Sequence, residues 1–512
     1  MYAIYFMIHY ITVATMPPLS NAQIDEQIEC YNELYRQHQQ DHVFHYRHEL
    51  DYDQKLQLLS DCQHIDIQHT NNIYNTSLQQ ETGYIENIKS NRDTIEPFTD
   101  ITYSNNAIHQ QPDELYYTRG MNAIVYNKVG VVLMSGGSGT RLKSTLPKGM
   151  YDIGLLSHKS LFHMHSERII RLQQLAQQYI LQHNITIDHT IQINWYIMTS
   201  IGTHELIKQY FDENNYFNLN SSQIQFFTQD EIPSYHIDTG KILMNNKYRI
   251  SMSPNGNGGI YSAMYKHGIL KHMADHSIQY IHIYGIDNVL VKLCDPTFIG
   301  WFVSQQNTVD IGNKVVMKSN PHEKVGVMCR QNHQTKVLEY SEIPNELCES
   351  RDPQTNELLY GAANIAQHIF TLDILNKLSQ QVLPYHIARK SIPYMDHHTN
   401  QVTVPTSINA IKLEMFIFDA FQYSNNIAAY AVDRSSEFSP VKNASGPGIV
   451  DSPATALSDI TQYNTRLIQS AGGRVINENN QIVEISGLIT YSGEGLQQIV
   501  NGKTYHAPVY IQ

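Results

Sequence analysis

The sequence is poor in the residues that mark disulfide scaffolds, zinc sites and nucleic-acid binding. Five cysteines are spread over 512 residues and no two form a Cys-x-x-Cys pair, which excludes a disulfide framework and the usual zinc spacings. Sparse cysteine of this kind is typical of reduced thiols, so we expect a cytoplasmic protein. The 35 basic residues are outnumbered by 48 acidic ones, and the resulting net charge of −13 argues against binding to nucleic acid.

Long apolar runs are also missing. No stretch of 18 apolar residues occurs, so we expect neither a transmembrane helix nor a membrane partner. Residues 1–15 are apolar but lack the basic start of a signal peptide, and we expect the protein to begin effectively at Met16. The 26 histidines are scattered without a His-Glu-x-x-His motif, which indicates surface residues rather than metal ligands.

A glycine-rich loop within residues 131–150 is the most informative feature. The stretch reads Val-Val-Leu-Met-Ser-Gly-Gly-Ser-Gly-Thr-Arg-Leu-Lys-Ser-Thr-Leu-Pro-Lys-Gly-Met. Glycines without a Cβ let backbone N–H groups close around phosphate oxygens. Arg141 and Lys148 add positive charge where a triphosphate would lie. The loop residues predicted to bind phosphate are Gly136, Gly137, Gly139 and Thr140.

The two common phosphate-binding loops are absent. The chain has no Gly-x-x-x-x-Gly-Lys-Ser/Thr, which disfavours a P-loop kinase or GTPase. It also has no Gly-x-Gly-x-x-Gly opening a helix with an acidic residue about 20 positions on, which disfavours a dinucleotide site. The alternative is a glycine-rich turn before a buried helix, with no ligand.

Short apolar runs alternate with helical segments after residue 122. Such alternation predicts a doubly wound, mostly parallel, Rossmann-like α/β sheet, in which ligands bind beyond the carboxyl ends of the strands. The glycine-rich loop follows the first strand, as that rule requires. The expected strands are Val131–Met134, Trp195–Thr199, Ile224–Phe227, Tyr280–Tyr284 and Val325–Cys329, with helices at Ser160–Gln177 and Tyr261–Asp275.

Composition divides the chain into three parts. Residues 1–120 form a polar, mainly helical N-terminal segment, residues 121–445 a catalytic domain, and residues 446–512 a small β-rich C-terminal module. Weak periodicity over residues 60–110 indicates loops or partly disordered insertions. The expected N-terminal helix has apolar residues at Ile24, Ile28, Tyr31, Leu34 and Tyr35; the C-terminal strands are Gln481–Ile485, Leu488–Tyr491 and Thr504–Tyr510.

Several further segments carry a family resemblance. The glycine loop with its Arg and Pro-Lys resembles that of sugar-nucleotide pyrophosphorylases. Over roughly residues 115–512 the chain is similar to eukaryotic-type UDP-N-acetylglucosamine pyrophosphorylases. The matching segments are Pro147–Gly154, Trp195–Ser200, Ser251–Gly259, Asp287–Lys292, Asp295–Gly300, Val337–Glu342, Ile411–Glu414, Glu437–Asn443 and Gly493–Gly495.

This resemblance implies an enzyme that moves UMP from UTP to N-acetylglucosamine 1-phosphate and releases pyrophosphate. It assigns phosphate binding and catalysis to Arg141, Lys148 and Lys442. Asp287 follows an expected strand, and a carboxylate near triphosphate is a natural Mg²⁺ ligand; the resemblance gives it the same role. Other substrate contacts are assigned to Gln229, Gly256, Asn257 and Gly258 at the uridine end, to Gly326, Glu339 and Asn364 around the sugar, and to Asn288, which follows Asp287.

The sequence departs from the family pattern at a few places. Ser138 replaces Gln, Lys143 replaces Gly, Ala363 stands where the family usually has Gly, and Ala410 replaces Gly. These changes leave two alternatives open. One is a uridylyltransferase for another sugar 1-phosphate, of N-acetylgalactosamine, glucose or galactose. The other is a non-catalytic nucleotide-sugar sensor. The oligomeric state is not indicated by the sequence.

Overall fold

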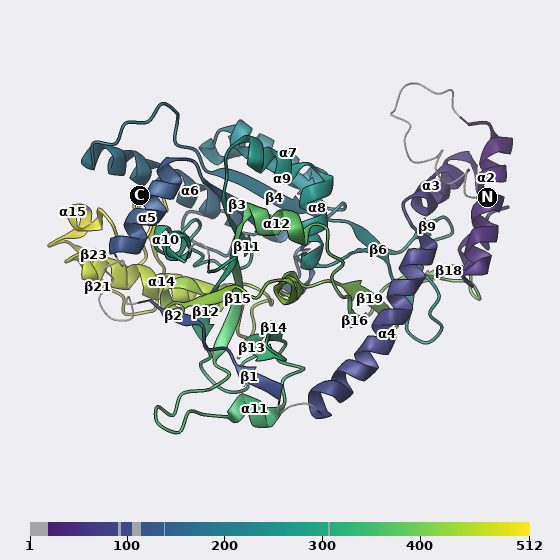
Figure 1. The fold of residues 1–512 in the computed structure, drawn as a ribbon. Coiled ribbons are helices and arrows are strands. Elements are labelled where there is room, and N and C mark those ends of the chain that lie inside the picture. Colours follow the sequence, from purple (N-terminus) through teal and green to yellow (C-terminus); the bar gives the residue numbers. More distant parts are fainter. Residues whose placement is uncertain (1–18, 91–93, 105–113, 138, 306–307) are drawn as a thin grey trace. The chain divides into compact units, whose positions relative to one another are not determined.

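The structure is a computed structural model that describes residues 19–104, 114–137, 139–305 and 308–512, except 91–93, with residues 82–90 as backbone alone (Figure 1). The apolar segment 1–15 and the expected start at Met16 lie outside the described residues. The chain divides into two units. The first combines residues up to Gln80 with Glu231–Ser253 and His386–Leu413, and the second comprises Glu81–Asp230, Pro254–Tyr385 and Glu414–Gln512.

The first unit combines helices with short strands from distant parts of the chain. Ile24, Ile28 and Tyr35 are buried on one face of α2, which confirms the predicted amphipathic helix. The expectation of loops over residues 60–110 is wrong for α4, a helix of 24 residues. The elements are α2 (Asn21–Gln37), η1 (Asp41–Phe44), α3 (Tyr52–Gln63), α4 (Ile67–Ser90), β6 (Glu231–Pro233), β7 (Tyr235–His236), β8 (Met244–Asn246), β9 (Arg249–Ile250), β10 (Met252–Pro254), β16 (His386–Lys390), β17 (Tyr394–Asp396), β18 (Gln401–Thr403) and β19 (Ala410–Glu414). Of these, α4, β10 and β19 end in residues of the second unit.

The second unit is built on a mixed sheet in the order β2-β20-β12-β15-β11-β3-β4-β5. β11, β3, β4 and β5 run parallel, whereas β15 is antiparallel to β11 and β12. The strands are β1 (Ile95–Pro97), β2 (Ile101–Tyr103), β3 (Val129–Met134), β4 (Asn194–Thr199), β5 (Ile224–Thr228), β11 (Tyr280–Gly285), β12 (Ile311–Met317), β13 (Val327–Gln331), β14 (Gln334–Leu338), β15 (Ala362–Thr371) and β20 (Ile427–Ala431). All five strands predicted for this sheet are present.

Helices cover both faces of this sheet, because alternate side chains of β3 enter two separate cores. Val131 and Leu133 pack with α5 (Glu114–Val125), α6 (Leu161–Gln182), α7 (His204–Glu213), α10 (Pro296–Ser304) and α14 (Pro453–Ser470). Val132 and Met134 pack with α8 (Ile260–Lys266), α9 (Ile269–Asp275) and α12 (Leu372–Leu378). The doubly wound α/β fold is therefore confirmed. The single helix expected over Tyr261–Asp275 is two helices, since Gly268 adopts a φ of +70° between them.

The C-terminal residues form a small module with its own apolar core. The strands pair in parallel as β21–β23 and β22–β24. The strand predicted at Leu488–Tyr491 is a turn instead, closed by the amide of Ile489 on the carbonyl of Ser486. The elements after α14 are β21 (Arg474–Ile476), β22 (Val483–Ile485), α15 (Leu496–Val500), β23 (Thr504–His506) and β24 (Val509–Ile511).

The observed division differs from the predicted boundaries at residues 120 and 445. The C-terminal module belongs to the second unit, and the first unit recruits two segments from within the predicted catalytic domain. Strand pairing is the physical reason, since β7 pairs with β19 across more than 170 residues of chain.

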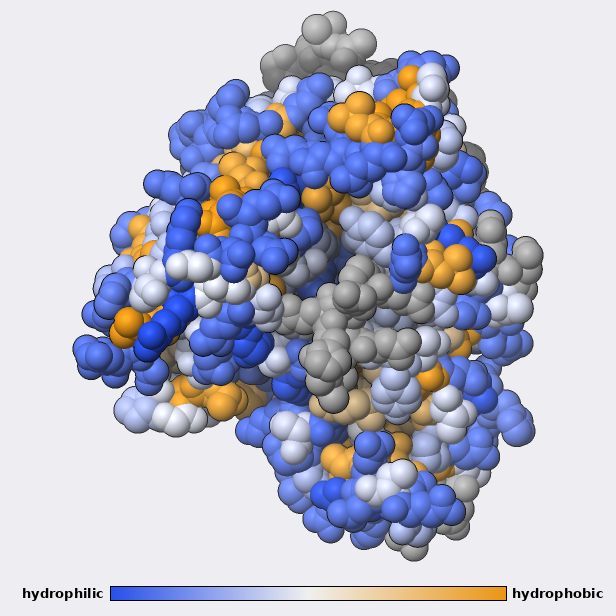
Figure 2. All heavy atoms as spheres, turned by 90° about the vertical axis from the view of Figure 1, so that its left-hand side faces the viewer, coloured by the Kyte–Doolittle hydropathy of each residue, from blue (hydrophilic) through white to orange (hydrophobic). Residues whose placement is uncertain are grey.

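The surface in Figure 2 is mainly hydrophilic, with apolar side chains in small separate groups. Within the described ranges, no helix is long and apolar enough to cross a membrane.

The contact between α5 and α10 generates a stability prediction. A Cβ added at Gly300 would lie 1.7 Å from the carbonyl oxygen of Tyr116, so Gly300→Ala must push the helices apart. We expect a loss of about 1–3 kcal/mol in unfolding free energy, the usual cost of overpacking. Equilibrium urea unfolding measures it. Gly202→Ala is the control, because no atom lies within 4 Å of its Cβ position. Equal stability of the two variants would contradict the close packing.

Candidate active site

Three segments of the second unit meet beyond the carboxyl ends of β3 and β11: the loop after β3, the loop after β11, and the segment that contains Lys442. The last residues of the two strands, Met134 and Gly285, lie side by side in the sheet. Backbone hydrogen bonds join the loops. The amide of Val441 donates to the carbonyl of Asp287 at 2.8 Å, and the amide of Ala444 donates to the carbonyl of Arg141 at 3.0 Å. Lys442 is therefore held between the loop after β3 and the loop after β11.

A cavity of about 260 Å³ lies among these loops, lined by Gly139, Thr140, Arg141, Leu142, Lys148, Asp287 and Lys442. Three cations and one carboxylate thus surround one space, in a chain whose net charge is −13. Within the described residues, Lys442 alone of these four has an ion-pair partner, the carboxylate of Asp451 at 3.8 Å. Positive charge is therefore concentrated at this cavity, although the chain as a whole is negatively charged.

Local structure explains how the first two cations are presented. Arg141 lies in the 3₁₀ turn η4 (Gly139–Leu142) and Lys148 begins the turn η5 (Lys148–Met150). A Cβ at Gly139 would lie 2.7 Å from the carbonyl oxygen of Leu146, so the chain between the two turns folds back tightly. Phe162 similarly fills the space beside Gly149 at 2.2 Å. Glycine is required at both positions to bring the two cations to one cavity.

The glycine loop also meets the residue predicted to recognise the base. Gln229 follows β5, and its backbone N–H donates to the carbonyl of Thr199 at 2.9 Å. Its side-chain Nε2 lies 2.4 Å from the position of a Cβ on Gly136. Gly137 is exposed, with no atom within 4 Å of its Cβ position. The structure therefore brings Gln229 to the loop and leaves the backbone of Gly137 open.

The second glycine-rich loop is tied to the chain after β19. The amide of Gly258 donates to the carbonyl of Met415 at 2.9 Å, and the Oδ1 of Asn257 accepts from the amide of Ile417 at 2.9 Å. Gly256 adopts a φ of +90°, and its Cβ position lies 2.3 Å from the carbonyl oxygen of Met415. These groups hold the loop in shape, so a contact with uridine must use atoms other than the Gly258 amide.

The three residues predicted to bind sugar lie together. The backbone N–H of Asn364 donates to the carbonyl of Gly326 at 2.9 Å. The Oε1 of Glu339 lies 3.2 Å from the Cβ position of Gly326. The register of β15 shifts beside Asn364, where Ala366 adopts a φ of +52°. β15 is an interior strand, and a bulge in a strand re-aims a side chain beside the bulge.

The side chain of Asn288 serves the protein backbone. Its Nδ2 donates to the carbonyl of Glu437 at 2.7 Å, and its Oδ1 accepts from the amide of Ser439 at 2.9 Å. Asn288 is buried and does not line the cavity. The predicted substrate contact at this position stays a prediction, whereas its bonds to the segment that carries Lys442 are part of the fold.

Sequence reasoning missed Asp451 as a neighbour of the cavity. Its carbonyl accepts from the amides of Lys442 at 2.7 Å and Asn443 at 2.9 Å. Burial raises the pKa of the Asp451 carboxyl, and the charge of Lys442 opposes that shift. The only sequence signal was the position of an Asp-Ser-Pro cap just before α14, which reads as an ordinary helix start.

The charged groups fit a magnesium ion of the kind that substrate helps to hold. Mg²⁺ is usually bound by one or two carboxylates together with substrate phosphates and water. The carboxylate of Asp287 lines the same cavity as the three cations. Across the described residues, no cluster of three or more His, Cys, Asp or Glu could hold a metal by itself.

Comparison with known proteins agrees with this geometry. The family model for UTP–glucose-1-phosphate uridylyltransferase matches residues 64–482. The chain is 38% identical to UDP-N-acetylglucosamine diphosphorylase 2 of Arabidopsis thaliana, covering 92% of this chain and 91% of that one. It is 39% identical to UDP-N-acetylglucosamine pyrophosphorylase of Saccharomyces cerevisiae, covering 81% and 85%.

A solved structure resembles the whole chain. The UDP-N-acetylglucosamine pyrophosphorylase of Trypanosoma brucei, in complex with an inhibitor, superposes with a TM-score of 0.77 at 28% identity, covering 95% of this chain and 96% of that one. Sequence and fold lead to the same conclusion: the chain belongs to the UTP–glucose-1-phosphate uridylyltransferase family.

Proposed function

We propose that the chain is a UDP-N-acetylglucosamine pyrophosphorylase, which transfers UMP from UTP to N-acetylglucosamine 1-phosphate and releases pyrophosphate. The observation that carries this proposal is the single cavity shared by Arg141, Lys148, Lys442 and Asp287 beside a glycine loop. Two polyanions must approach each other in this reaction, and only concentrated positive charge makes that approach favourable. The 38–39% identity to relatives of that name supports the choice of substrate.

The chemistry needs positioning and charge stabilisation only. The sugar phosphate is already an ionised nucleophile, so it can attack the α-phosphorus of UTP in line without a covalent enzyme intermediate. Arg141 and Lys148 lie next to the glycine loop and suit the triphosphate, while Lys442 comes from a separate segment and suits the sugar phosphate. Held in this way, the cations neutralise charge that develops as pyrophosphate leaves.

We propose Mg²⁺ as the cofactor, with Asp287 as its protein ligand. When bound, the ion neutralises phosphate charge and aligns the phosphate oxygens. Asp287 would hold it from the end of β11, in the cavity that it lines together with Gly139 and Thr140.

The sugar site is proposed from the cluster of Gly326, Glu339 and Asn364. A carboxylate accepts hydrogen bonds from sugar hydroxyls, and an amide can both donate and accept. Gly326 is buried, and its Cβ position lies 2.9 Å from the Cγ1 of Val337 and 3.2 Å from the Oε1 of Glu339, so only glycine lets these neighbours pack so closely against the backbone.

A cytoplasmic location is proposed as well. All five cysteines are free and four of them are buried, which suits a reducing compartment.

The first test of function is a substrate panel. Purified protein with UTP and Mg²⁺ should release pyrophosphate fastest with N-acetylglucosamine 1-phosphate, because a carboxylate and an amide that can bond to the sugar lie together at Gly326. The panel includes N-acetylgalactosamine, glucose and galactose 1-phosphates. Preference for an unacetylated sugar would overturn the sugar assignment, and no release with any sugar would favour a sensor.

The cations of the glycine loop provide a second test. Lys148→Met should lower kcat by on the order of 10²–10³, the range measured for lost preorganised donors. Lys143→Met is the matched control, since Lys143 is an exposed lysine of the same loop that does not line the cavity. Steady-state pyrophosphate release measures both variants. Similar rates for the two would remove Lys148 from the mechanism.

The metal proposal predicts a magnesium-specific defect. Asp287→Asn keeps the size of the side chain but loses its charge, so the Mg²⁺ concentration for half-maximal rate should rise by more than about 10-fold, since even residues that only support a metal ligand cost about 10- to 100-fold in affinity when lost. Chelation of metal should stop the wild-type reaction, and added Mg²⁺ should restore it. An unchanged magnesium requirement in the variant would place the ion elsewhere.

A further inference from the structure

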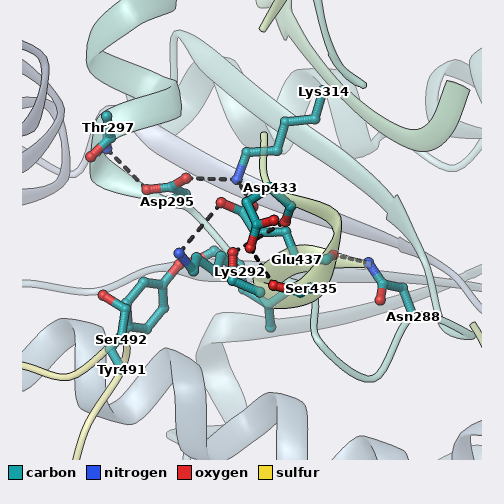
Figure 3. A network of polar contacts seen from close by, with 12 residues as sticks. Asn288, Lys292, Asp295, Thr297, Lys314, Asp433, Ser435, Glu437, Tyr491 and Ser492 are labelled. Atoms are coloured by element: carbon teal, nitrogen blue, oxygen red, sulfur yellow. Dashed lines mark hydrogen bonds and ion pairs between the residues drawn. The ribbon is translucent and has the colours of Figure 1, made fainter. Parts of the chain in front are cut away.

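A buried ionic network connects the segments that carry Asp287 and Lys442. Lys314 on β12 is fully buried, with its Nζ 2.6 Å from the Oδ2 of Asp295 and 2.5 Å from the Oε2 of Glu437. The Nζ of Lys292 lies 3.4 Å from the other carboxylate oxygen of Glu437. Figure 3 shows the two lysines approaching Glu437 from different elements. Two cations and two carboxylates therefore balance in the interior.

Fold stability alone is a weak reason for such a network. Burying charges is costly, and well-packed apolar residues of similar size are often as stable or more so. β12 otherwise reads as an apolar strand, Ile-Gly-Asn-Lys-Val-Val-Met, in which an apolar residue could replace Lys314. What a buried ion pair supplies, and apolar contact does not, is a fixed geometry for the segments that carry the charges.

The network holds one of the segments that shape the active site. Glu437 ends α13 (Arg434–Glu437) and precedes Lys442 by five residues. Its carbonyl accepts the Asn288 side chain at 2.7 Å. The amide of Val289 then donates to the carbonyl of Ser439 at 3.0 Å. Asn288 and Pro440 form an antiparallel bridge, and the bond from Val441 to Asp287 continues this pairing. The place of Lys442 therefore depends on how the segment that begins at Glu437 is held.

We propose that Glu437 is a positioning residue, held by Lys314 and Lys292, that fixes the place of Lys442 in the cavity it lines together with Asp287. Lys292 belongs to the same stretch as Asp287, so its contact with Glu437 ties the metal-binding segment and the lysine segment together a second time. This inference rests on the proposed function, because it assigns Lys442 to the sugar phosphate. It adds residues that never touch substrate.

Asp295 offers a matched control for Glu437. Both carboxylates pair with the same Nζ of Lys314 at nearly the same distance, and both side chains are buried. The other bond of Asp295 goes to the amide of Thr297, where it caps the start of α10 at 3.1 Å. Loss of either charge unbalances the network, but only Glu437 lies in the segment that carries Lys442.

The experiment compares Glu437→Gln with Asp295→Asn. Both variants should lower the urea midpoint, since each leaves a buried lysine with one carboxylate fewer. Glu437→Gln should in addition lower kcat/KM for N-acetylglucosamine 1-phosphate by about 10²-fold, the effect of a misplacement of about 1 Å. Its affinity for UTP without sugar should stay close to wild type, because the glycine loop is untouched. Asp295→Asn should keep kcat/KM for the sugar phosphate close to wild type.

A second variant protects the test against misfolding. Lys292 lies at the edge of the network, with 19% of its side chain exposed, and Lys292→Met should reproduce the sugar-phosphate defect in a milder form. Equal kinetic losses in Glu437→Gln and Asp295→Asn, or a loss of UTP affinity in both, would reduce the network to general stability. Wild-type protein in the same assay separates the two proposals, because absence of its turnover overturns the function itself.

Discussion

Two backbone hydrogen bonds organise the catalytic side of this molecule. The amides of Val441 and Ala444 bind the carbonyls of Asp287 and Arg141, and these contacts join three loops that are separated by more than 140 residues of sequence each. Backbone bonds of this kind do not depend on the side chains they bring together. The main-chain bonds therefore bring the three segments together whatever charged side chains they carry.

Electrostatics explains why the site is arranged as a local concentration of charge. A chain with a net charge of −13 repels polyanions at long range, so attraction must come from a few cations placed around a small space. Three such cations line a cavity of about 260 Å³. The carboxylate of Asp287 at the same place would repel phosphate by itself, which is why a divalent cation between them makes physical sense.

In the buried ionic network, unlike in the cavity, positive and negative charges are equal in number. There the charges of Lys314, Asp295 and Glu437 are buried and, together with partly exposed Lys292, cancel one another. A balanced set of buried charges resists displacement, because separating any pair exposes an unpaired charge to a medium of low polarity. The cavity thus carries excess positive charge, whereas the charges of the buried network are balanced. The segment from Glu437 to Lys442 connects the network with the cavity.

Local sequence determined the glycine loop, the five predicted strands of the sheet, the amphipathic helix α2 and the charged groups of the site, because glycine, apolar periodicity and motif order act over short stretches. The family resemblance added the residue roles. Tertiary structure alone decided which segments meet. The pairing of β7 with β19, the antiparallel insertion of β15, the bond of Asn288 to Glu437 and the burial of Lys314 all join residues far apart in the chain. Such contacts depend on three-dimensional packing, and an apolar strand containing one lysine carries no sign of the two carboxylates that will neutralise it.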